Sequence, residues 1–453
     1  MTISLERDIA LREGFASDAS GLHLVPDAIA RPASAEEVVA IIRECASSGT
    51  SVTAAGGQTS TTGGSITDAG VVLSLRTMDH LFDVDEQART IRVEPGAIVS
   101  DIKRAAAEYG LLFAPDPTSE ESCTIGGSIA CNASGARTLR YGATRSHVRA
   151  LTVVLASGET VELRRNPLEK NTVGYSMVHD PIDWFVGSEG TLGIVVGAEL
   201  SLLPLPSRVT GLSIPFTSEQ AALGFVVAAR RSALSPRCLE YLDDLALGLT
   251  ALAHSDRMAP AGAAAAVYTE DAGEDDIDLD AWLQLAEAHG ALGDDVRIFE
   301  GESALREARD ARHAIPATMN ERGARCRAVG GRKVSTDWAV PFPRLGEAIA
   351  AARGHARAAG IEQAVIYGHA GNGHPHQNFI AADADDVKRI ERVVEETLRT
   401  VIAMGGTVAA EHGIGKIKRK WVGLQLSALQ ISAMRAIKRE LDPLGTLAPG
   451  NVL

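Results

Sequence analysis

Cysteine is scarce in this chain, and its spacing excludes several kinds of site. The chain has 453 residues, and its five cysteines are isolated from one another: Cys45, Cys123, Cys131, Cys238 and Cys326. A disulfide framework, a cysteine-bound zinc site and an iron–sulfur cluster all need paired or closely spaced cysteines. We therefore expect reduced thiols and a cytoplasmic protein.

The chain also has few aromatic residues, fewer basic than acidic residues, and no long apolar run. Aromatic residues make up only 4% of the chain, so small residues such as Ala and Gly must fill much of the core. The net charge of -14 leaves no excess of Lys and Arg to neutralise phosphates, which argues against a nucleic-acid partner. No apolar run approaches a membrane span, and the first residues, MTISLERDIALREGF, have no signal-peptide core.

The length predicts more than one hydrophobic core, because a chain of this size exceeds the usual limit of a single domain. The succession of predicted strands and helices is interrupted at Pro204 to Ser207, where we expect a domain boundary. Residues 34–49 predict a helix, since Ser34 and Glu37 have capping-box spacing and Gly49 follows the apolar stripe. Strands are expected at 51–55, 71–75 and 90–94, a helix at 98–109, and a hairpin at 150–163.

The second half contains several further expected elements. An Ala-rich segment at 262–266 predicts a packed helix, and the acidic run at 270–280 predicts a solvated loop. Residues 386–404 predict an amphipathic helix closed by Gly405, and a strand is expected at 407–415. The last twelve residues, DPLGTLAPGNVL, predict a tail that docks on the body of the protein.

Two Gly-rich stretches in the first half have the chemistry of anion-binding loops. In AAGGQTSTTGG, Gly56 and Gly57 can adopt positive φ, so consecutive N–H groups can converge on an anion beside the hydroxyls of Thr59 and Ser60. The stretch PDPTSEESCTIGGSIACNASG repeats this chemistry with Thr124, Gly126, Gly127, Ser128, Asn132 and Ser134. Two such loops in one domain indicate a diphosphate that is bound from both sides. Because neither a G-x-G-x-x-G fingerprint nor a P-loop is present, we expect this site to lie outside a Rossmann crevice.

These loops, followed by YG at 141–142, NTVGY at 171–175 and VGSEGTLGI at 186–194, resemble the FAD-binding domain of the vanillyl-alcohol oxidase and p-cresol methylhydroxylase flavoprotein superfamily. The resemblance implies an α+β fold: a two-subdomain FAD-binding domain over 1–205, an α+β substrate domain with antiparallel sheet over 206–410, and a segment 411–453 returning to the first domain. Relatives that bind FAD covalently use His or Cys in these loops, and Cys123 and Cys131 leave the second loop open to such a bond. We interpret both as small packing residues and expect non-covalent FAD. The residues that it places at FAD are Gly56, Gly57, Gln58, Thr59, Ser60, Gly63, Pro117, Thr124, Gly126, Gly127, Ser128, Asn132, Ser134, Ile194 and Asn451.

Three histidines stand close together in YGHAGNGHPHQN, residues 367–378. The stretch predicts a hairpin in which His369 ends the first strand as His376 enters the second, so that their imidazoles can meet. The stretch TVAAEHGIG, residues 407–415, predicts a strand that ends in Glu411 and His412. These two residues can share a site only at a strand end, where Gly413 allows the chain to bend. Two histidines and a carboxylate form a common ligand set for zinc, iron or manganese, but a hairpin turn can also carry histidine for hydrogen bonding alone.

The stretches GHAGNGHPHQN and EHGIG are similar to paired motifs of the FAD-linked D-2-hydroxy acid dehydrogenases, a group that includes D-lactate and D-2-hydroxyglutarate dehydrogenases and the glycolate oxidase flavoprotein subunit. The resemblance implies that His369, His376 and Glu411 bind a divalent metal, zinc in preference to manganese or iron. It places His412 as catalytic base, Asn378 at the substrate, and Arg312 and Lys333 near a substrate carboxylate. His374 is expected to be a solvent-facing turn residue or an alternative ligand.

The implied reaction is oxidation of a D-2-hydroxy acid to the 2-oxo acid, with hydride transfer to flavin N5, by a dehydrogenase in preference to an oxidase. The acid, the oligomeric state and the electron acceptor stay open, the acceptor among oxygen, a quinone, a cytochrome and an electron-transfer flavoprotein. Two alternatives remain: a flavin transferase resembling alkylglycerone-phosphate synthase, and a non-catalytic FAD-carrying subunit of a larger complex.

Overall fold

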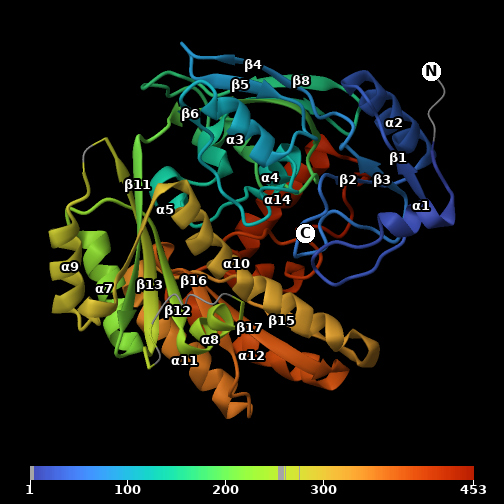
Figure 1. The fold of residues 1–453 in the computed structure, drawn as a ribbon. Helices are drawn as coiled ribbons and strands as arrows, with labels where there is room; N and C mark the ends of the chain where they lie inside the picture. Colours follow the sequence, from blue (N-terminus) through green and yellow to red (C-terminus); the bar gives the residue numbers. More distant parts are fainter. Residues whose placement is uncertain (1–4, 254–259, 261, 275) are drawn as a thin grey trace. The chain divides into compact units, whose positions relative to one another are not determined.

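The computed structural model describes residues 5–253, 260, 262–274 and 276–453, and the chain divides into two compact units. Unit 1 consists of Met1–Ser134, Gly142–Leu205 and Glu411–Leu453, and unit 2 of Gly135–Tyr141 and Pro206–Ala410. The short segment 135–141, which carries helix α5 (Thr138–Tyr141), therefore packs with unit 2. Each unit combines helices with antiparallel sheet, which confirms the expected α+β class (Figure 1).

Unit 1 begins with a small parallel sheet, and a two-stranded antiparallel sheet joins β6 (Leu111–Leu112) to β10 (Leu203–Pro204) further along the same unit. The three strands of the parallel sheet run in the order β1 (Ala28–Ala30), β3 (Val71–Ser74), β2 (Val52–Ala55). Helix α2 (Ala35–Ser48) buries one apolar stripe against them, and Ser34 and Gly49 cap it as predicted. The carboxylate of Glu37 accepts the N–H of Ala33 rather than that of Ser34, so the capping box is shifted by one residue.

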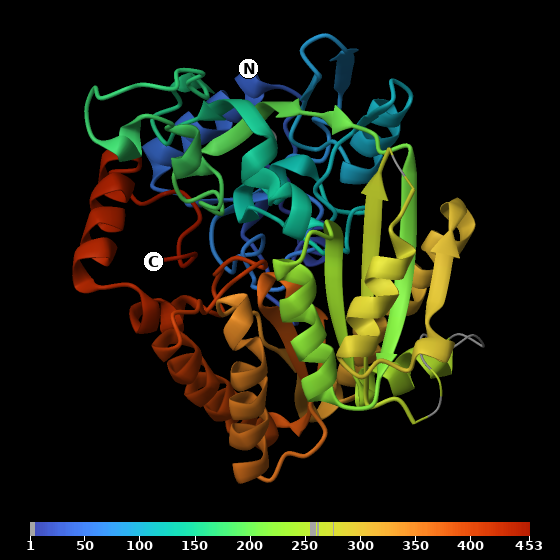
Figure 2. The same cartoon turned by 90° about the vertical axis from the view of Figure 1, so that its left-hand side faces the viewer.

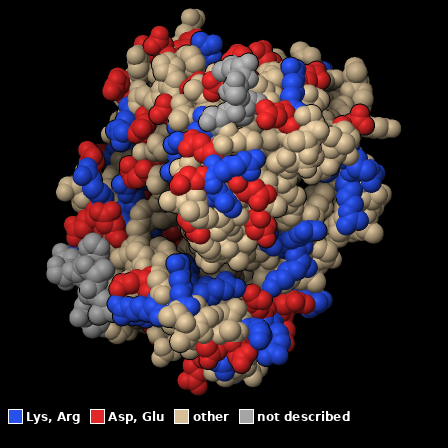
Figure 3. Space-filling model, turned by 90° about the vertical axis from the view of Figure 1, so that its right-hand side faces the viewer, with Lys and Arg blue, Asp and Glu red and all other residues tan. Residues whose placement is uncertain are grey.

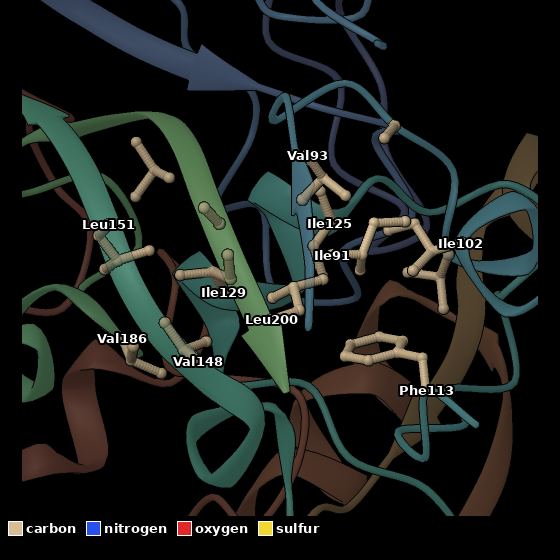
Figure 4. Close-up of a cluster of buried hydrophobic side chains, with 14 of the residues drawn as sticks. Ile91, Val93, Ile102, Phe113, Ile125, Ile129, Val148, Leu151, Val186 and Leu200 are labelled. Atoms are coloured by element: carbon tan, nitrogen blue, oxygen red, sulfur yellow. The ribbon is translucent and has the colours of Figure 1, made fainter. Parts of the chain in front are cut away.

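The larger sheet of unit 1 is antiparallel and has the order β4-β5-β9-β7-β8. The hairpin expected at 150–163 is formed by β7 and β8, which pair around the Ser157–Gly158 turn. Helices α3 (Val99–Ala107) and α4 (Ile125–Cys131) contribute to the apolar core that this sheet shares, in which Ile102, Phe113 and Ile129 are fully buried (Figure 4). The strands are β4 (Leu81–Asp85), β5 (Thr90–Val93), β7 (Val148–Val154), β8 (Thr160–Arg164) and β9 (Ile194–Ser201).

The end of the chain docks on unit 1, as the sequence predicted. After helix α14 (Ala428–Leu441), Leu447 forms a bridge with Val52 of β2. The N–H of Val52 donates to Thr446 O at 2.8 Å, and the N–H of Ala448 donates to Val52 O at 2.7 Å. The tail therefore extends the edge of the small sheet, and Asn451 becomes buried.

Unit 2 is built on a seven-stranded sheet in which every neighbouring pair is antiparallel. Its order is β14 (Arg297–Glu300), β11 (Arg208–Phe216), β13 (Ala265–Gly273), β12 (Pro236–Asp243), β16 (Val365–His369), β17 (His374–Asp383), β15 (Gly330–Ser335). Helices α8 (Asp244–Ala253) and α10 (Gly301–Arg325) lie on one face (Figure 1). The other helices are α7 (Glu219–Arg231), α9 (Leu279–Ala288), α11 (Leu345–Ala358) and α12 (Ala384–Ala403), and α11 and α12 lie side by side (Figure 2).

Two segments of unit 2 differ from the prediction. The Ala-rich residues that were expected to form a helix lead into β13, where Ala265 and Ala266 are fully buried between two neighbouring strands. The acidic run begins inside the same strand, so Glu270 is buried rather than solvated; residues 261 and 275 lie outside the described part of the chain. Alanine has the highest helix propensity, but the advantage is below about 1 kcal/mol per residue. Pairing on both sides of β13 outweighs it, and it also outweighs the polarity of the acidic residues.

The segment around Thr407 also differs from the prediction. In the described chain its only β-bridge joins Thr407 to Ala339, so no strand forms over 407–415.

Among the described helices, none has both the length and the apolarity needed to cross a bilayer. On the face drawn in Figure 3, acidic and basic side chains are interspersed.

Candidate active site

Three histidines gather where the β16–β17 hairpin turns. His369 ends β16 and His374, the first residue of β17, is its direct partner in the ladder, while His376 lies opposite Tyr367. Alternation along β17 places His374 and His376 on the same face of the sheet. The potential ligand atoms of the three imidazoles lie within 4.8 Å of one another. The expected meeting of His369 and His376 is confirmed, with their ring centroids 5.3 Å apart.

His374 is not a solvent-facing turn residue. Its side chain is buried, with 4% of the residue exposed, and its ring centroid lies 4.6 Å from that of His376. The turn itself is covered, because Val340 N donates to Gly373 O at 3.0 Å. Gly373 has a φ of 69°, and a Cβ there would stand 2.0 Å from Val340 O, so only glycine fits this approach.

Asp337 joins this cluster, although it was not among the residues predicted for the site. An oxygen of its buried carboxylate lies 3.1 Å from His374 Nε2. The backbone brings it there because Thr336, the preceding residue, continues the pairing of β15 with β17 by donating its N–H to Gln377 O at 3.0 Å. A lone Asp after a strand is too common in sequences to be singled out, and only the register of the two strands reveals its place.

Glu411 directly follows a residue whose backbone is hydrogen-bonded to Asp337. The N–H of Ala410 donates to Asp337 O at 2.8 Å, so Glu411 is one peptide bond away from a residue anchored beside the histidines. Within unit 1, the carbonyl of His412 accepts a hydrogen bond from the Thr62 hydroxyl at 3.4 Å. Gly413 has a φ of 76°, which confirms the bend that the sequence required after His412.

A buried carboxylate holds the segment that follows His412. Glu189 accepts the N–H groups of Ile414 at 2.6 Å and Gly415 at 2.8 Å. Burial raises the pKa of Glu189, although these two hydrogen bonds act in the opposite direction. Glu189 lies in the VGSEGTLGI stretch, so that motif positions the EHGIG stretch inside unit 1.

Asn378 and Lys333 share the sheet face that carries the histidines. Asn378 follows His376 by two residues on β17, and Lys333 lies on β15 opposite Ile380. Asn378 is 0% exposed, and in the described chain neither its Nδ2 nor its Oδ1 has a hydrogen-bond partner. Such a buried amide is costly unless a ligand satisfies it. Lys333 donates to Asn320 Oδ1 at 2.9 Å, and burial lowers its pKa to about 8.

Arg312 reaches the same face from α10, but it already has a partner. Its guanidinium lies 3.2 Å from Glu240 Oε2 on β12, and Glu240 Oε1 lies 2.8 Å from His369 Nδ1. Burial opposes ionisation of Glu240, yet His369 and Arg312 together hold its pKa below the usual range. No sequence motif marks Glu240, so it was not among the predicted site residues.

The first Gly-rich loop of unit 1 fits an anionic group, but not by the expected backbone geometry. Gly56 and Gly57 do not have positive φ; Gln58 at 54° and Gly63 at 77° do. Within the described chain, the backbone N–H groups of residues 57–61 donate to no protein acceptor, so they are available to a ligand. Gly56 and Gly57 are instead needed for close packing, since a Cβ at Gly57 would stand 2.2 Å from Ser122 O.

The second Gly-rich stretch forms helix α4 rather than a loop throughout. Thr124 caps it by accepting the N–H of Gly127 at 3.3 Å, and Asn132 ends it in the left-handed region. Gly126 packs against Pro95, where a Cβ would stand 2.7 Å from a side-chain carbon. A Cβ at Gly56 would meet the Thr124 hydroxyl at 2.1 Å, so the first loop lies directly against this helix.

The remaining residues expected at FAD also lie in unit 1. Asn451 connects the tail to the first loop, because its Nδ2 donates to Gly64 O at 2.7 Å and its Oδ1 accepts from Lys416 at 2.7 Å. Burial raises the pKa of the Cys123 and Cys131 thiols, which disfavours the thiolate in both. The others occupy the first loop, the approach to α4, the helix and its end, and the start of β9: Thr59, Ser60, Pro117, Ser128, Ser134 and Ile194.

Comparisons with known proteins cover most of the chain. Residues 26–164 match the family described as FAD binding domain, and residues 205–452 match the family described as FAD linked oxidases, C-terminal domain. The chain is 34% identical to a D-2-hydroxyglutarate dehydrogenase of Xanthomonas citri and 32% identical to glycolate oxidase subunit GlcD of Bacillus subtilis, in each case over 94% of this chain and 89% of the relative.

A third relative and a solved structure extend the comparison. A D-lactate dehydrogenase of Archaeoglobus fulgidus is 31% identical over 94% of this chain and 91% of its own. The fold is similar to that of an alkyldihydroxyacetonephosphate synthase, with a TM-score of 0.73 and 18% identity over 98% of this chain and 82% of that one. At this identity the structural match concerns the fold alone.

Proposed function

Because this chain belongs to the family of FAD-linked oxidases, we propose that it is a dehydrogenase that converts a D-2-hydroxy acid, similar to lactate or 2-hydroxyglutarate, into the 2-oxo acid with the help of a divalent metal ion. The observation that carries the proposal is the buried cluster of His369, His374 and His376 on the face that also holds the unsatisfied amide of Asn378. The relatives named for D-lactate, D-2-hydroxyglutarate and glycolate support this substrate class.

FAD fits the residues of unit 1. The N–H groups of residues 57–61 suit the diphosphate, and the first loop, α4 and Asn451 lie around one another as an extended ligand requires. The flavin supplies the acceptor for the hydride that leaves C2 of the acid. The high pKa values of Cys123 and Cys131 favour non-covalent binding, because a thiolate is the form that attacks a flavin.

A divalent metal fits the histidine cluster. Imidazole nitrogens suit zinc best among the candidates, with manganese or iron as alternatives. His369 and His376 would hold the ion together with Glu411, while the Asp337 carboxylate engages His374. A metal at this place acts as a Lewis acid that lowers the pKa of a coordinated hydroxyl group.

The polar side chains on the same face would orient the acid. Asn378 would hydrogen-bond to it, which removes the cost of the two unsatisfied amide atoms. Arg312 has five N–H donors, so its bond to Glu240 leaves donors for the substrate carboxylate. Lys333 would add a positive charge below its pKa of about 8. His412 would take the hydroxyl proton, since imidazole titrates near neutral pH.

An anaerobic visible spectrum tests this proposal. The full-length protein is mixed in turn with D-lactate, L-lactate, D-2-hydroxyglutarate and glycolate, before and after treatment with a chelator. We expect one D-acid to bleach the flavin, L-lactate to leave it oxidised, chelation to abolish bleaching, and added Zn²⁺ to restore it.

The same spectra separate the rival functions. Bound flavin that none of the acids reduces would contradict the proposal and favour a transferase or a carrier subunit. Bleaching that survives complete metal removal would contradict only the metal-assisted part. Absence of bound flavin in protein refolded or purified with excess FAD would contradict the FAD site itself.

A further inference from the structure

Unit 2 contains two buried carboxylates that the proposed reaction does not use. Glu240 on β12 and Glu270 on β13 are each only 4% exposed, and both face arginines. Glu270 is held by Arg137, at 3.1 Å, and Arg237, and Glu240 is held by Arg312 at 3.2 Å. Burying such groups costs free energy unless each charge is paired, so their arrangement needs an explanation.

Glu240 differs from Glu270 in one respect, because it also contacts a histidine of the cluster. Its Oε1 lies 2.8 Å from His369 Nδ1, while its Oε2 faces the Arg312 guanidinium. A carboxylate paired with an arginine can only accept hydrogen bonds, so the proton of this contact lies on Nδ1 of His369. In the neutral imidazole, which is the form that binds a metal, the other ring nitrogen, Nε2, then carries its lone pair.

A lone pair on Nε2 is what a metal ligand needs. His374 and His376 lie close to the His369 ring, with centroid distances of 5.5 Å and 5.3 Å. With Nδ1 engaged by Glu240, the ligand atom that His369 offers to this cluster is Nε2. Carboxylates that hold the second nitrogen of a metal-binding histidine set its tautomer, its ring orientation and its basicity.

We propose that Glu240 is a positioning residue that holds His369 as the Nδ1–H tautomer and thereby sets the affinity of the histidine cluster for a divalent cation. The inference rests on the proposed function in one respect, namely that the cluster binds a metal. Glu240 itself needs no contact with the substrate, the flavin or the ion.

Arg312 takes part in the same arrangement. It holds the second oxygen of Glu240, and its guanidinium carbon lies 5.3 Å from the centre of the Tyr268 ring, whose hydroxyl donates to Glu270 at 3.2 Å. Arg312 therefore keeps Glu240 in place as an anion from a rigid support. In addition to its proposed contact with the substrate, Arg312 would help to orient His369 through Glu240.

The test compares Glu240→Gln with a matched control, Glu270→Gln, in the full-length protein. The two carboxylates lie on neighbouring strands, have equal exposure and each face an arginine. Only Glu240 touches a histidine of the cluster. Zn²⁺ affinity is measured by competition with a fluorescent chelator, and FAD content is measured from the flavin absorbance. We expect Glu240→Gln to weaken Zn²⁺ binding by about 10–100-fold, whereas Glu270→Gln should change it less than about threefold.

A second measurement keeps the test valid if Glu240→Gln fails to fold. Long-range ¹H–¹⁵N spectra of wild-type protein labelled only at histidine report the tautomer of each ring, and His369→Gln identifies the resonances of His369. We expect the proton on Nδ1. In a His369→Ala background, Glu240→Gln should cause no further loss of Zn²⁺ affinity.

The outcomes separate this inference from the proposed function. Wild-type protein that binds no Zn²⁺ would overturn the metal-assisted reaction and this inference together. Zn²⁺ binding that Glu240→Gln leaves unchanged, or a His369 proton found on Nε2, would overturn only the role of Glu240. An equal loss in Glu270→Gln would also overturn it, because the effect would then come from charge burial rather than from the contact with His369.

Discussion

Replacing Asn378 with leucine should stabilise the protein without ligands while it abolishes turnover. The two side chains have similar volumes, and Asn378 is 0% exposed with both of its amide atoms unsatisfied in the described chain. An unsatisfied buried polar group costs about 1–3 kcal/mol. Relief of that cost should raise the free energy of unfolding by about 2 kcal/mol, which corresponds to roughly 4–8 °C in Tm for a domain of about 150–250 residues.

Thermal unfolding in chelator-treated buffer without substrate measures the stability, and flavin reduction by the reactive D-acid measures turnover. Gln377→Leu is the matched control, because Gln377 is the next residue, is equally buried and has an unsatisfied Oε1. Its side chain points to the opposite face, where Nε2 lies 3.5 Å from Ala352 O of α11. We expect this control to retain turnover.

Two results would refute the reasoning about Asn378. A fall in Tm for Asn378→Leu would mean that the Asn378 amide forms hydrogen bonds in the folded protein. The protein without ligands would then carry no free-energy cost that a bound substrate could remove. Unchanged turnover in a correctly folded Asn378→Leu protein would remove Asn378 from the substrate site. A gain in stability together with lost turnover is the pattern of a residue kept for binding.

Three further predictions concern the cofactor, the base and a half-buried lysine. Gly57→Ala should lower the FAD content of purified protein, because its Cβ would stand 2.2 Å from Ser122 O, whereas Gly14→Ala, with open space around it, should not. His412→Ala should lower the rate of flavin reduction by about 10²–10⁴-fold with FAD content unchanged, and a retained rate would exclude His412 as the base. Burial lowers the pKa of Lys333 to about 8, so between pH 8 and its ordinary value of 10.5 the unfolded chain binds more protons than the folded one, and stability rises with pH. The stability of wild-type protein relative to Lys333→Met should therefore increase by roughly 2 kcal/mol from pH 7.5 to 9.5, and a difference in unfolding free energy that stays constant with pH would contradict the burial of this charge.

Local patterns in the sequence were sufficient for several elements of the fold. Ser34 and Gly49 mark the ends of α2, and Gly405 follows α12, because caps depend on the residues next to them. The β16–β17 hairpin and the convergence of His369 and His376 followed from strand periodicity around a short turn. The resemblance of the motifs to a flavoprotein family identified the cofactor, which the matches to FAD-linked families confirm.

Pairing between distant strands decided what local patterns could not. The Ala-rich residues enter β13 because β11 and β12 flank them, and the same pairing buries Glu270. His374 is buried rather than exposed because it stands in register with His369 and because Val340 covers the turn.

The Gly-rich stretches, the histidines of the hairpin and the EHGIG stretch can be recognised from local motifs, because each is short and continuous in the chain. The side chains that lie around them are set by tertiary contacts. Glu240 and Arg312 are 72 positions apart, and Asp337 is 37 positions from His374, so no local pattern links them. Their contacts arise from strand register and helix packing, which depend on the whole sheet of unit 2 rather than on any neighbouring residue.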